Sequence, residues 1–476
     1  MMTHELPSQK RRFWTVASDQ VDVDLLVFFR IAFAVVGLSW VVKQYASGAI
    51  EHFYTGPRFY FHYYGFHWVP SLPEGWAKAE FLIMGIAAVC VGCGAFYRVA
   101  SLLFAIGFTH LFLSDKCLYQ NHYYLICLIS WLMVIVPAHH AFSLDAMFRP
   151  TIRSQSVPRW AIWLLRFQIG VPYFFGGIAK INSDWLAGEP MRSMLSQRAD
   201  FPMVGQYFNE EWCVYLFAYG GLIFDLLVVP ALLTKRFRVF ACLAAVGFHL
   251  TNSWLFTIGV FPWFMLLALP IFFDPGCIRK RFARPMEELV ATTAPSSFNI
   301  SRPFAFALAI FVMWQTLFPL RHLAIPGNPS WTEEGHYFAW HMLIRGKRGA
   351  LRYLATDRRT GNTGAIDLRR YVTEFQLSRL SRDPRMIHEL SHYIASDLRS
   401  LGFEVELRAL ALVSMNGRKP QLLVDRDVDL VKEQIDWRKP EWIVPLKEPL
   451  RDVPWGKPLS EWEALLNQNP QSSVSE

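Results

Sequence analysis

Long apolar runs separated by short polar links occupy the first 320 residues of the chain. Several of these runs approach the roughly 20 apolar residues that a helix needs to cross the hydrocarbon layer of a membrane. We place seven single runs and one double-length run at about residues 25–42, 79–96, 99–113, 123–136, 160–180, 212–233, 304–320 and 239–273. With the double run counted as two, the pattern predicts a polytopic α-helical membrane protein with about nine transmembrane helices.

The double-length run is longer than one membrane span but short for two full spans and a loop. It contains His249, Asn252 and Gly259. Irregular backbone at membrane depth is tolerated only where protein covers it or where it lines a cavity. We therefore expect two short or broken helices that meet within the protein. Discontinuous helices also occur in transporters, but those proteins carry internal repeats, and none is visible in this sequence.

From Arg321 the pattern changes to that of a water-exposed domain of roughly 155 residues, an ordinary domain size. Asn416-Gly417 between two apolar segments is the strongest hairpin signal in it. The predicted elements are strands at 341–345 and 351–355 joined by residues 346–349, a strand at 366–368 that pairs back, a helix at 384–401, and strands at 405–415 and 419–424. We expect a transmembrane domain at residues 1–320 and a β-rich α+β domain at residues 321–476.

The composition agrees with a membrane protein, because 53% of the residues are hydrophobic, against about 45–50% in soluble proteins. The net charge is +8, and the basic clusters lie in alternate links, at Arg98, 149–159, 235–238 and 279–284. The positive-inside rule then makes the polar tail at residues 1–12 cytoplasmic and residues 321–476 extracytoplasmic. Compact loops without sorting signals favour a bacterial inner membrane. No nucleic-acid-binding motif accompanies the charge, so we expect no nucleic-acid partner.

Cysteine usage and motif searches exclude several kinds of site. The chain has seven cysteines, and Cys90-x-x-Cys93 lies within an apolar run, where helix packing is its expected role. No disulfide framework is implied. We find no His, Asp, Glu or Cys spacing of a metal site, no nucleophilic triad, no P-loop and no dinucleotide fingerprint, so no metal is expected.

Charged and polar residues inside apolar runs need partners, which makes each of them a candidate for function. Arg30, Arg166 and Asp225 are the deepest charges in their runs, and we expect them to form a structural ion-pair set. Further polar residues lie at a similar predicted outer depth: Asn121, His122, Lys180, His249 and Asn252. These five residues form either a shared site or separate, satisfied core groups.

Lys180 lies where an apolar run turns polar, in the stretch Gly176-Gly177-Ile-Ala-Lys180-Ile-Asn-Ser-Asp184-Trp185. An ammonium at the edge of a hydrocarbon layer snorkels, pairs or loses its proton. If it loses the proton, the neutral amine becomes a usable general base. The alternative is a snorkelling anchor at a helix end. The aromatic loop 53–76 either roofs such a site or forms an interfacial belt, and we favour the belt.

Four separated motifs together resemble the vitamin K-dependent gamma-carboxylase family, here of the bacterial type, from about Asp22 to Trp455. They are Gly177-Ile-Ala-Lys180-Ile-Asn-Ser-Asp184-Trp185, Asn121-His122-Tyr123, Phe248-His249-x-x-Asn252-Ser-x-Leu-Phe256-x-Ile258-Gly259 and Asp357-Arg358-Arg359-Thr360-Gly361. The sequence differs from the animal enzymes in having Ala179-Lys180 where they carry two adjacent lysines.

The resemblance implies a reaction and the residues that carry it. A neutral lysine deprotonates reduced vitamin K, a phylloquinone or menaquinone hydroquinone, which reacts with O2. The resulting base removes a γ proton from a glutamate of a protein or peptide substrate, and CO2 adds to give gamma-carboxyglutamate and vitamin K epoxide. Lys180 matches the base and His122 an active-site histidine, while Asn121, His249, Asn252 and Trp185 are the candidate quinone-binding residues. No metal takes part.

The resemblance also assigns roles to the two domains. The transmembrane domain would be catalytic, the lipophilic quinone would enter it from the bilayer, and the extracytoplasmic domain would bind the glutamyl substrate. Two alternatives stay open, a quinol epoxidase without glutamyl carboxylation and a non-catalytic, lipid-binding membrane scaffold. We expect epoxidation more firmly than carboxylation.

Overall fold

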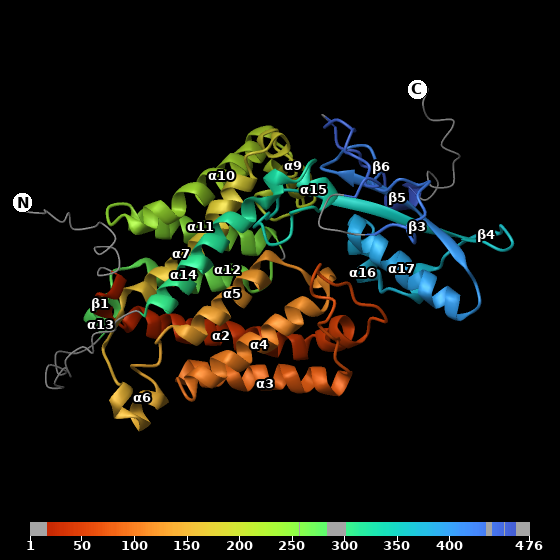
Figure 1. Ribbon diagram of the computed structural model, residues 1–476. Coiled ribbons are helices and arrows are strands. Elements are labelled where there is room, and N and C mark those ends of the chain that lie inside the picture. Colours follow the sequence, from red (N-terminus) through yellow and green to blue (C-terminus); the bar gives the residue numbers. More distant parts are fainter. Residues whose placement is uncertain (1–16, 257, 283–300, 435–439, 452, 463–476) are drawn as a thin grey trace, which may run out of the picture.

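The computed structural model describes residues 17–256, 258–282, 301–434, 440–451 and 453–462. A helical bundle comes first in the chain, and a domain with a four-stranded sheet follows; we call this C-terminal part the outer domain (Figure 1). The expected tail at 1–12, the basic residue Arg284 and the polar end at 468–476 lie outside the described residues.

The bundle helices coincide with the apolar runs. They are α2 (Asp24–Ala46), α3 (Glu74–Cys93), α4 (Tyr97–Ser114), α5 (Asn121–Ile135), α7 (Arg159–Ala179), α10 (Glu211–Leu233), α11 (Arg238–Leu255), α12 (Phe261–Ala268) and α14 (Arg302–Leu317). Within the described residues, six helices are long and apolar enough to cross a membrane: α2, α3, α4, α7, α10 and α14 with its continuation η7 (Phe318–Ala324). The chain is therefore a polytopic helical membrane protein, and nine spans stay a prediction, because α5 and α12 are shorter and α11 is less apolar.

Short elements connect these helices. In the bundle they are β1 (Gln20–Asp22), η1 (Ile50–Thr55), η2 (Lys116–Leu118), α6 (Leu144–Phe148), η3 (Pro150–Ile152), β2 (Ser156–Pro158), α8 (Ser183–Leu186), α9 (Met191–Ser196), η4 (Gly205–Tyr207), η5 (Leu269–Phe272) and α13 (Cys277–Phe282). β1 pairs antiparallel with β2. These two strands and α13 lie at the end of the bundle away from the outer domain (Figure 1).

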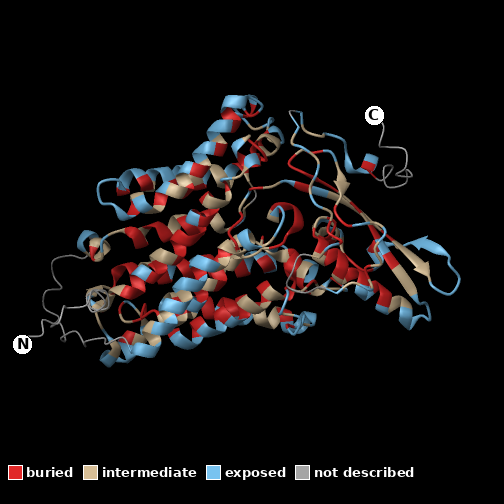
Figure 2. Ribbon diagram, turned by 45° about the horizontal axis from the view of Figure 1, so that its top comes forward, coloured by how far each residue is buried: buried red, intermediate tan, exposed pale blue. Residues whose placement is uncertain are grey.

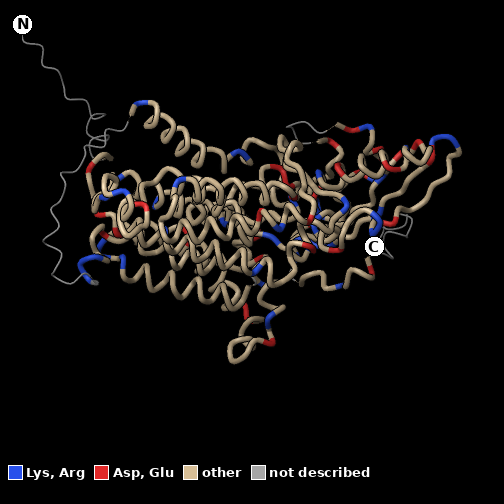
Figure 3. Tube along the Cα trace, turned by 90° about the horizontal axis from the view of Figure 1, so that it is seen from below, with Lys and Arg blue, Asp and Glu red and all other residues tan. Residues whose placement is uncertain are grey.

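The bundle is apolar outside as well as inside. Buried residues face the interior of both domains, while the outward faces of the helices stay exposed (Figure 2). Leu216, Ile223 and Leu227 of α10 are examples of large hydrophobic side chains on the exposed faces. Charged residues are sparse along the bundle and gather at its two ends and in the outer domain (Figure 3). This distribution is what a surrounding hydrocarbon layer requires.

The double-length run is broken, as predicted. α11 ends at Leu255 and α12 begins at Phe261, and Gly259 between them has a positive φ of 66°. Phe256 and Ile258 of this break line the cavity described below. The irregular backbone therefore borders a cavity, which is one of the conditions for its presence at this depth.

The outer domain is built on one antiparallel sheet with the strand order β4-β3-β5-β6. Its elements are α15 (Pro329–Thr332), β3 (Lys347–Asp357), β4 (Thr363–Ala365), η8 (Leu368–Arg370), α16 (Glu374–Leu380), α17 (Pro384–Ser400), β5 (Val405–Met415) and β6 (Gln421–Leu422). β3 and β5 pair along their full length, from Lys347 opposite Met415 to Asp357 opposite Val405.

Most predicted elements of the outer domain are present. Asn416 and Gly417 have φ angles of 52° and 74°, which is the left-handed geometry of a tight hairpin turn between β5 and β6. α17 begins after Asp383, whose carboxylate accepts the main-chain N–H groups of Arg385 and Met386, and it ends just before Gly402. The strand predicted at 366–368 lies earlier in the chain, as β4, and Leu368 instead begins η8. Ile366 still donates to the oxygen of Tyr353.

Two predictions need correction. Residues 341–345 do not form a strand, because Leu343 has a left-handed φ of 56°, and β3 is a single strand paired with β5 rather than half of a 341–355 hairpin. The loop 53–76 lines no part of the cavity described below. Phe61 is fully buried in the core of the outer domain, and Phe59 packs on Tyr393 of α17 at 4.6 Å. The loop thus packs against both domains, and of its aromatic residues Tyr64, Trp68 and Trp76 stay exposed.

Candidate functional site

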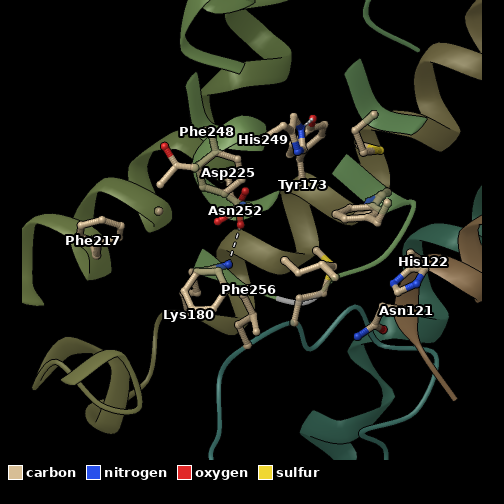
Figure 4. Close-up of a pocket in the computed structure, with 18 of the residues that line it drawn as sticks. Asn121, His122, Tyr173, Lys180, Phe217, Asp225, Phe248, His249, Asn252 and Phe256 are labelled. Carbon is tan, nitrogen blue, oxygen red and sulfur yellow. Dashed lines mark hydrogen bonds and ion pairs between the residues drawn. The ribbon is translucent and has the colours of Figure 1, made fainter. Parts of the chain in front are cut away.

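A cavity of about 610 Å³ lies between the bundle and the outer domain, and we call it the Lys180 cavity (Figure 4). Its walls come from α5, α7, α10, α11, the break before α12 and the loop at Met342 and Leu343. All six residues predicted from the sequence line it: Asn121, His122, Lys180, Trp185, His249 and Asn252. The structure therefore supports a shared site over separate core groups.

Lys180 is buried and paired. It caps the C-terminus of α7 and is 5% exposed. Its Nζ donates to Asp225 Oδ2 of α10 at 2.6 Å and to the main-chain oxygen of Gly176 at 3.3 Å. The indole ring of Trp185 lies 5.1 Å from the same nitrogen. A snorkelling anchor would extend to water instead, so the anchor interpretation does not fit this side chain.

The residues around Lys180 hold the lysine in place. Asn182 caps α8 by accepting the main-chain N–H of Trp185 at 3.0 Å, and the Trp185 indole donates to the oxygen of Ala218 on α10 at 2.8 Å. A Cβ at Gly176 would lie 3.3 Å from Asp225 Oδ2, and a Cβ at Gly177 would lie 2.7 Å from Leu226 Cδ2. These two glycines let α7 and α10 approach closely enough for the Lys180–Asp225 contact.

Asp184 connects the lysine motif to the outer domain. Its carboxylate accepts two hydrogen bonds from the Arg418 guanidinium, at 2.6 and 2.8 Å, and one from Asn416 at 2.8 Å. Burial alone would raise the pKa of Asp184, but the hydrogen bonds from Arg418 and Asn416 hold it below its ordinary value. The turn between β5 and β6 is thereby fixed to the segment that carries the lysine.

His249 lies on another wall of the cavity. Its Nε2 is 2.6 Å from the hydroxyl oxygen of Tyr173 on α7, while its Nδ1 is buried without a hydrogen-bond partner among the described residues. Asn252 follows at i+3 on the same helix face, as predicted, and also lines the cavity. A buried polar atom without a partner is costly, so Nδ1 is suited to meet a polar group of a ligand.

His122 and Asn121 lie across the cavity from Lys180 and Asp225 (Figure 4). The His122 ring stacks on Phe261 with centroids 5.6 Å apart, and within the described part of the chain no group hydrogen-bonds to its nitrogens. Asn121 donates to the main-chain oxygen of His341 at 3.1 Å and so contacts the loop of the outer domain. His122 therefore faces the same space as Lys180 from the other side, without touching the amine.

The expected ion-pair set of Arg30, Arg166 and Asp225 does not form. Arg30 donates to the main-chain oxygens of Ala138, Ala141 and Phe142, and Arg166 donates to those of Ile271 and Phe273. Each guanidinium donates to main-chain oxygens at a bend of the chain. Several of these acceptors lie close together there, and they match the fixed directions of the guanidinium N–H groups. Asp225 pairs with Lys180 instead.

The partner of the lysine does not follow from a local motif. Asp225 lies 45 residues after Lys180, and a local motif search does not connect them. The available signal was the lone carboxylate deep in an apolar run, which needs a cationic partner at the same depth. Tyr173 was missed as well, because a tyrosine in an apolar helix is usually a packing residue.

The chemistry that this arrangement can perform is proton transfer on an apolar ligand. One buried amine–carboxylate pair and two imidazoles face a space lined mostly by apolar and aromatic side chains, among them Phe217, Phe248, Phe256 and Met265. Its volume is in the range of roughly 300–1,000 Å³ of small-molecule sites. A lipophilic molecule with an ionisable hydroxyl group matches both properties.

Two family models match the chain. Residues 19–276 match the HTTM domain, and residues 301–449 match the lumenal domain of vitamin K-dependent gamma-carboxylase. The first match covers the bundle through the end of η5, and the second covers the outer domain with the preceding α14. No solved structure matches the chain. Lys180, His122 and the other predicted cavity residues all lie in the first matched segment. The chain belongs to the vitamin K-dependent gamma-carboxylase family.

Proposed function

We propose that the protein oxidises vitamin K hydroquinone with O2 to the epoxide and couples this reaction to carboxylation of protein glutamate. The observation that carries the proposal is the buried Lys180 amine, which faces an apolar cavity beside Asp225 in a chain of this family. No metal is invoked in the reaction. The quinone is a phylloquinone or a menaquinone.

The residues present fit such a ligand. The apolar lining suits a fused ring and its prenyl tail, and the polar groups lie on opposite walls, with Lys180 on one and His122 on the other. His249 Nδ1 is a buried nitrogen without a partner among the described residues, and a ligand oxygen or hydroxyl group would satisfy it. When bound and oxidised by O2, the quinol supplies a base strong enough to remove a glutamate γ proton.

Lys180 acts as the general base toward a ligand hydroxyl group. Its amine must first be neutral, and Asp225 Oδ2, at 2.6 Å, is the nearest group that can hold the departing proton. The Gly176 oxygen and the Trp185 ring then keep the amine in its place. The site excludes water, because both partners of the pair are almost fully buried.

The histidines orient the ligand from the other walls. Tyr173 fixes the His249 ring through Nε2, which leaves Nδ1 free to contact a ligand oxygen or hydroxyl group. His122 stacks on Phe261 with its nitrogens unpaired in the described structure, so it is available to a second ligand oxygen. Neutral imidazoles accept or donate hydrogen bonds without adding charge to an apolar site.

The glutamyl substrate enters from the side of the outer domain. Met342, Leu343 and Arg379 of this domain line the same cavity as Lys180. Arg379 offers a cation to a carboxylate that approaches through this opening. A peptide glutamate and a membrane-soluble quinol can thus reach one space from different sides.

The test is turnover by the purified protein in detergent. Wild-type protein given vitamin K hydroquinone and O2 should form epoxide, and a glutamate-containing peptide with labelled bicarbonate should become carboxylated. Lys180→Ala should reduce epoxide formation by at least about 100-fold, the lower end of general-base contributions. Lys235→Ala is the matched control, because this exposed lysine lies outside the cavity.

Each outcome of this experiment decides between functions. Epoxide without carboxylated peptide would support a quinol epoxidase that lacks a glutamyl substrate. No epoxide from wild-type protein, or unchanged epoxide from the Lys180 variant, would refute the enzymatic proposal and favour a lipid-binding scaffold.

A further inference from the structure

Helix α17 of the outer domain contains His388-Glu389-Leu390-Ser391-His392, which has the H-E-x-x-H pattern. Histidines at i and i+4 share one helix face and can bind one metal ion together. The expectation that no His, Asp, Glu or Cys spacing matches a metal site is therefore wrong for this helix. None of these residues lines the Lys180 cavity.

Three donor atoms converge on this face. The Nε2 atoms of His388 and His392 lie 3.0 Å apart, and the main-chain oxygen of Glu433 lies 2.8 Å from the first and 3.3 Å from the second. Metal–ligand bonds of about 2.0–2.1 Å place adjacent ligands roughly 2.9–3.4 Å apart in octahedral or tetrahedral geometry. The triangle has the dimensions of one face of such a coordination shell.

Hydrogen bonds alone do not satisfy these three atoms. A ring nitrogen either carries a proton and donates or carries a lone pair and accepts. If both Nε2 atoms donate to Glu433, two N–H groups face each other at 3.0 Å. If one of them accepts from the other, its lone pair faces the carbonyl oxygen. A cation removes this conflict, because all three atoms direct a lone pair toward it.

His388, Glu389, His392 and Glu433 line a groove that holds a second set of donor atoms, and part of this set is already hydrogen-bonded. His62, His67 and Glu389 place one ligand atom each within 4.8 Å of one another. Glu389, however, accepts the main-chain N–H of His62 and lies 3.0 Å from the Nδ1 of its ring. In H-E-x-x-H peptidases this glutamate activates a water molecule. Its engagement by His62 argues for metal binding without peptide hydrolysis.

We propose that His388, His392 and the main-chain oxygen of Glu433 bind one divalent transition-metal ion of the zinc type. Imidazole ligands select zinc, copper, iron or nickel over magnesium and calcium. His388 is buried and stacks on Trp442 with ring planes 9° apart, which fixes its orientation, whereas His392 is exposed and lets the ion enter. The bound ion would fasten the chain at Glu433 to α17.

The test measures zinc binding by the full-length protein in detergent after treatment with a chelator. Equilibrium dialysis against Zn²⁺ should give one ion per chain, and excess Mg²⁺ should not compete. His392→Gln should weaken binding by at least about 100-fold, the upper end of the loss seen when a residue that merely supports a ligand is removed. His67→Gln is the matched control, an exposed histidine of the same groove, and should leave the affinity within about threefold.

Thermal unfolding gives a second readout that needs no enzymatic activity. An ion that binds only the folded chain raises the melting temperature, so Zn²⁺ should stabilise wild-type protein and the His67 variant but not the His392 variant. The proposal is overturned if wild-type protein binds no zinc, if the His392 variant binds it equally well, or if His67→Gln is the variant that loses it.

Discussion

At the scale of single residues, the Lys180 amine and the Asp225 carboxylate lie 2.6 Å apart and almost completely out of water. Removing two charges from water costs several kcal/mol for each ion, and mutual attraction offsets this cost only in part. A neutral amine beside a protonated carboxyl avoids most of the cost. The proposed base function requires this neutral form of the pair.

This argument predicts the effect of Asp225→Asn. The amide keeps the size of the side chain but cannot hold the proton that Lys180 releases, so epoxide formation should fall by about 100-fold at neutral pH. The deficit should shrink as the pH rises, because a lower proton concentration favours the neutral amine without help from the carboxylate. The measurement is the pH–rate profile of the purified variant.

Two outcomes would contradict the proposed role of Asp225. A deficit of equal size at every pH would show that the carboxylate only holds the lysine in position. A variant faster than wild type would show that the carboxylate acts by keeping the lysine charged. Epoxide formation by Asp225→Glu should exceed that by Asp225→Asn, since it restores a proton acceptor.

Several polar residues that line the Lys180 cavity could be predicted from the sequence. Lys180 and His122 stand out because polar groups near the ends of apolar runs are few, and the structure places both on one cavity. Asp225 was recognised as a buried charge but assigned the wrong partner, because pairing across helices depends on how α7 and α10 pack. The H-E-x-x-H pattern of α17 is local and could be predicted from the sequence.

At the scale of elements, the contact between α7 and α10 positions the lysine. Gly177 lies against Leu226, and an added Cβ would come within 2.7 Å of Leu226 Cδ2 and 3.2 Å of its main-chain nitrogen. The helices would have to separate, because main-chain atoms cannot move aside as a flexible side chain does. Separation would also lengthen the Lys180–Asp225 contact.

Gly177→Ala should therefore destabilise the protein by about 1–3 kcal/mol, the usual cost of overpacking, and also lower epoxide formation. The matched control is Gly247→Ala in α11, where an added Cβ meets nothing within 4 Å. That change should be neutral or stabilising by up to about 1 kcal/mol, because alanine favours helix over glycine. Thermal unfolding in detergent compares the two variants, and equal midpoints would refute the packing argument.

The helices, turns and strands show which sequence patterns are enough to predict an element. Apolar runs located the bundle helices, and Asn416-Gly417 located a hairpin turn, because both signals are local. Residues 341–345 were mistaken for a strand since their apolar content resembles one. Phe338, Trp340 and Leu343 instead have left-handed backbone, and Phe338 and Trp340 pack onto the core of the bundle, a contact that no local pattern records.

At the scale of the whole molecule, Asp184 joins the outer domain to the lysine segment through Arg418. Asp184→Asn would leave a buried guanidinium without its charge partner and should cost about 3–5 kcal/mol. The added replacement Arg418→Gln should recover part of this loss, because it removes the unpaired charge. Thermal unfolding of the single and double variants measures the recovery, and additive losses would contradict the coupling.

The contact between Asp184 and Arg418 also predicts how the stability of the folded protein changes at acidic pH. The pKa of Asp184 is lower in the folded chain than the ordinary value of 3.8, so its contribution to stability is complete above that value. It is lost as the pH falls through the lowered pKa. Wild-type protein should therefore lose more stability below pH 3.8 than Asp184→Asn does. Parallel stability curves for the two proteins would exclude this role.

The arrangement of the bundle also restricts how often the chain crosses the membrane. β1 lies at one end of the bundle and the outer domain at the other, and α14 leads from the end at α13 to the outer domain (Figure 1). A chain that crosses an even number of times returns to its starting end. Among the described residues, the six long apolar helices give an even number, so α5, α11 and α12 together should contribute an odd number of crossings.

Nine crossings satisfy this condition and place the two ends of the bundle on opposite sides of the membrane. An epitope inserted in the exposed turn at Thr360 should then be cleaved by protease that is added to the extracytoplasmic side of intact cells. An epitope at Lys235, which lies 3.4 Å from Asp274 at the end of the bundle near α13, should be protected there and cleaved in inverted vesicles. Nine spans place three crossings between Lys235 and Thr360, by α11, α12 and α14. Cleavage of both epitopes from one side would instead mean an even number of crossings between them, and it would refute the nine-span prediction.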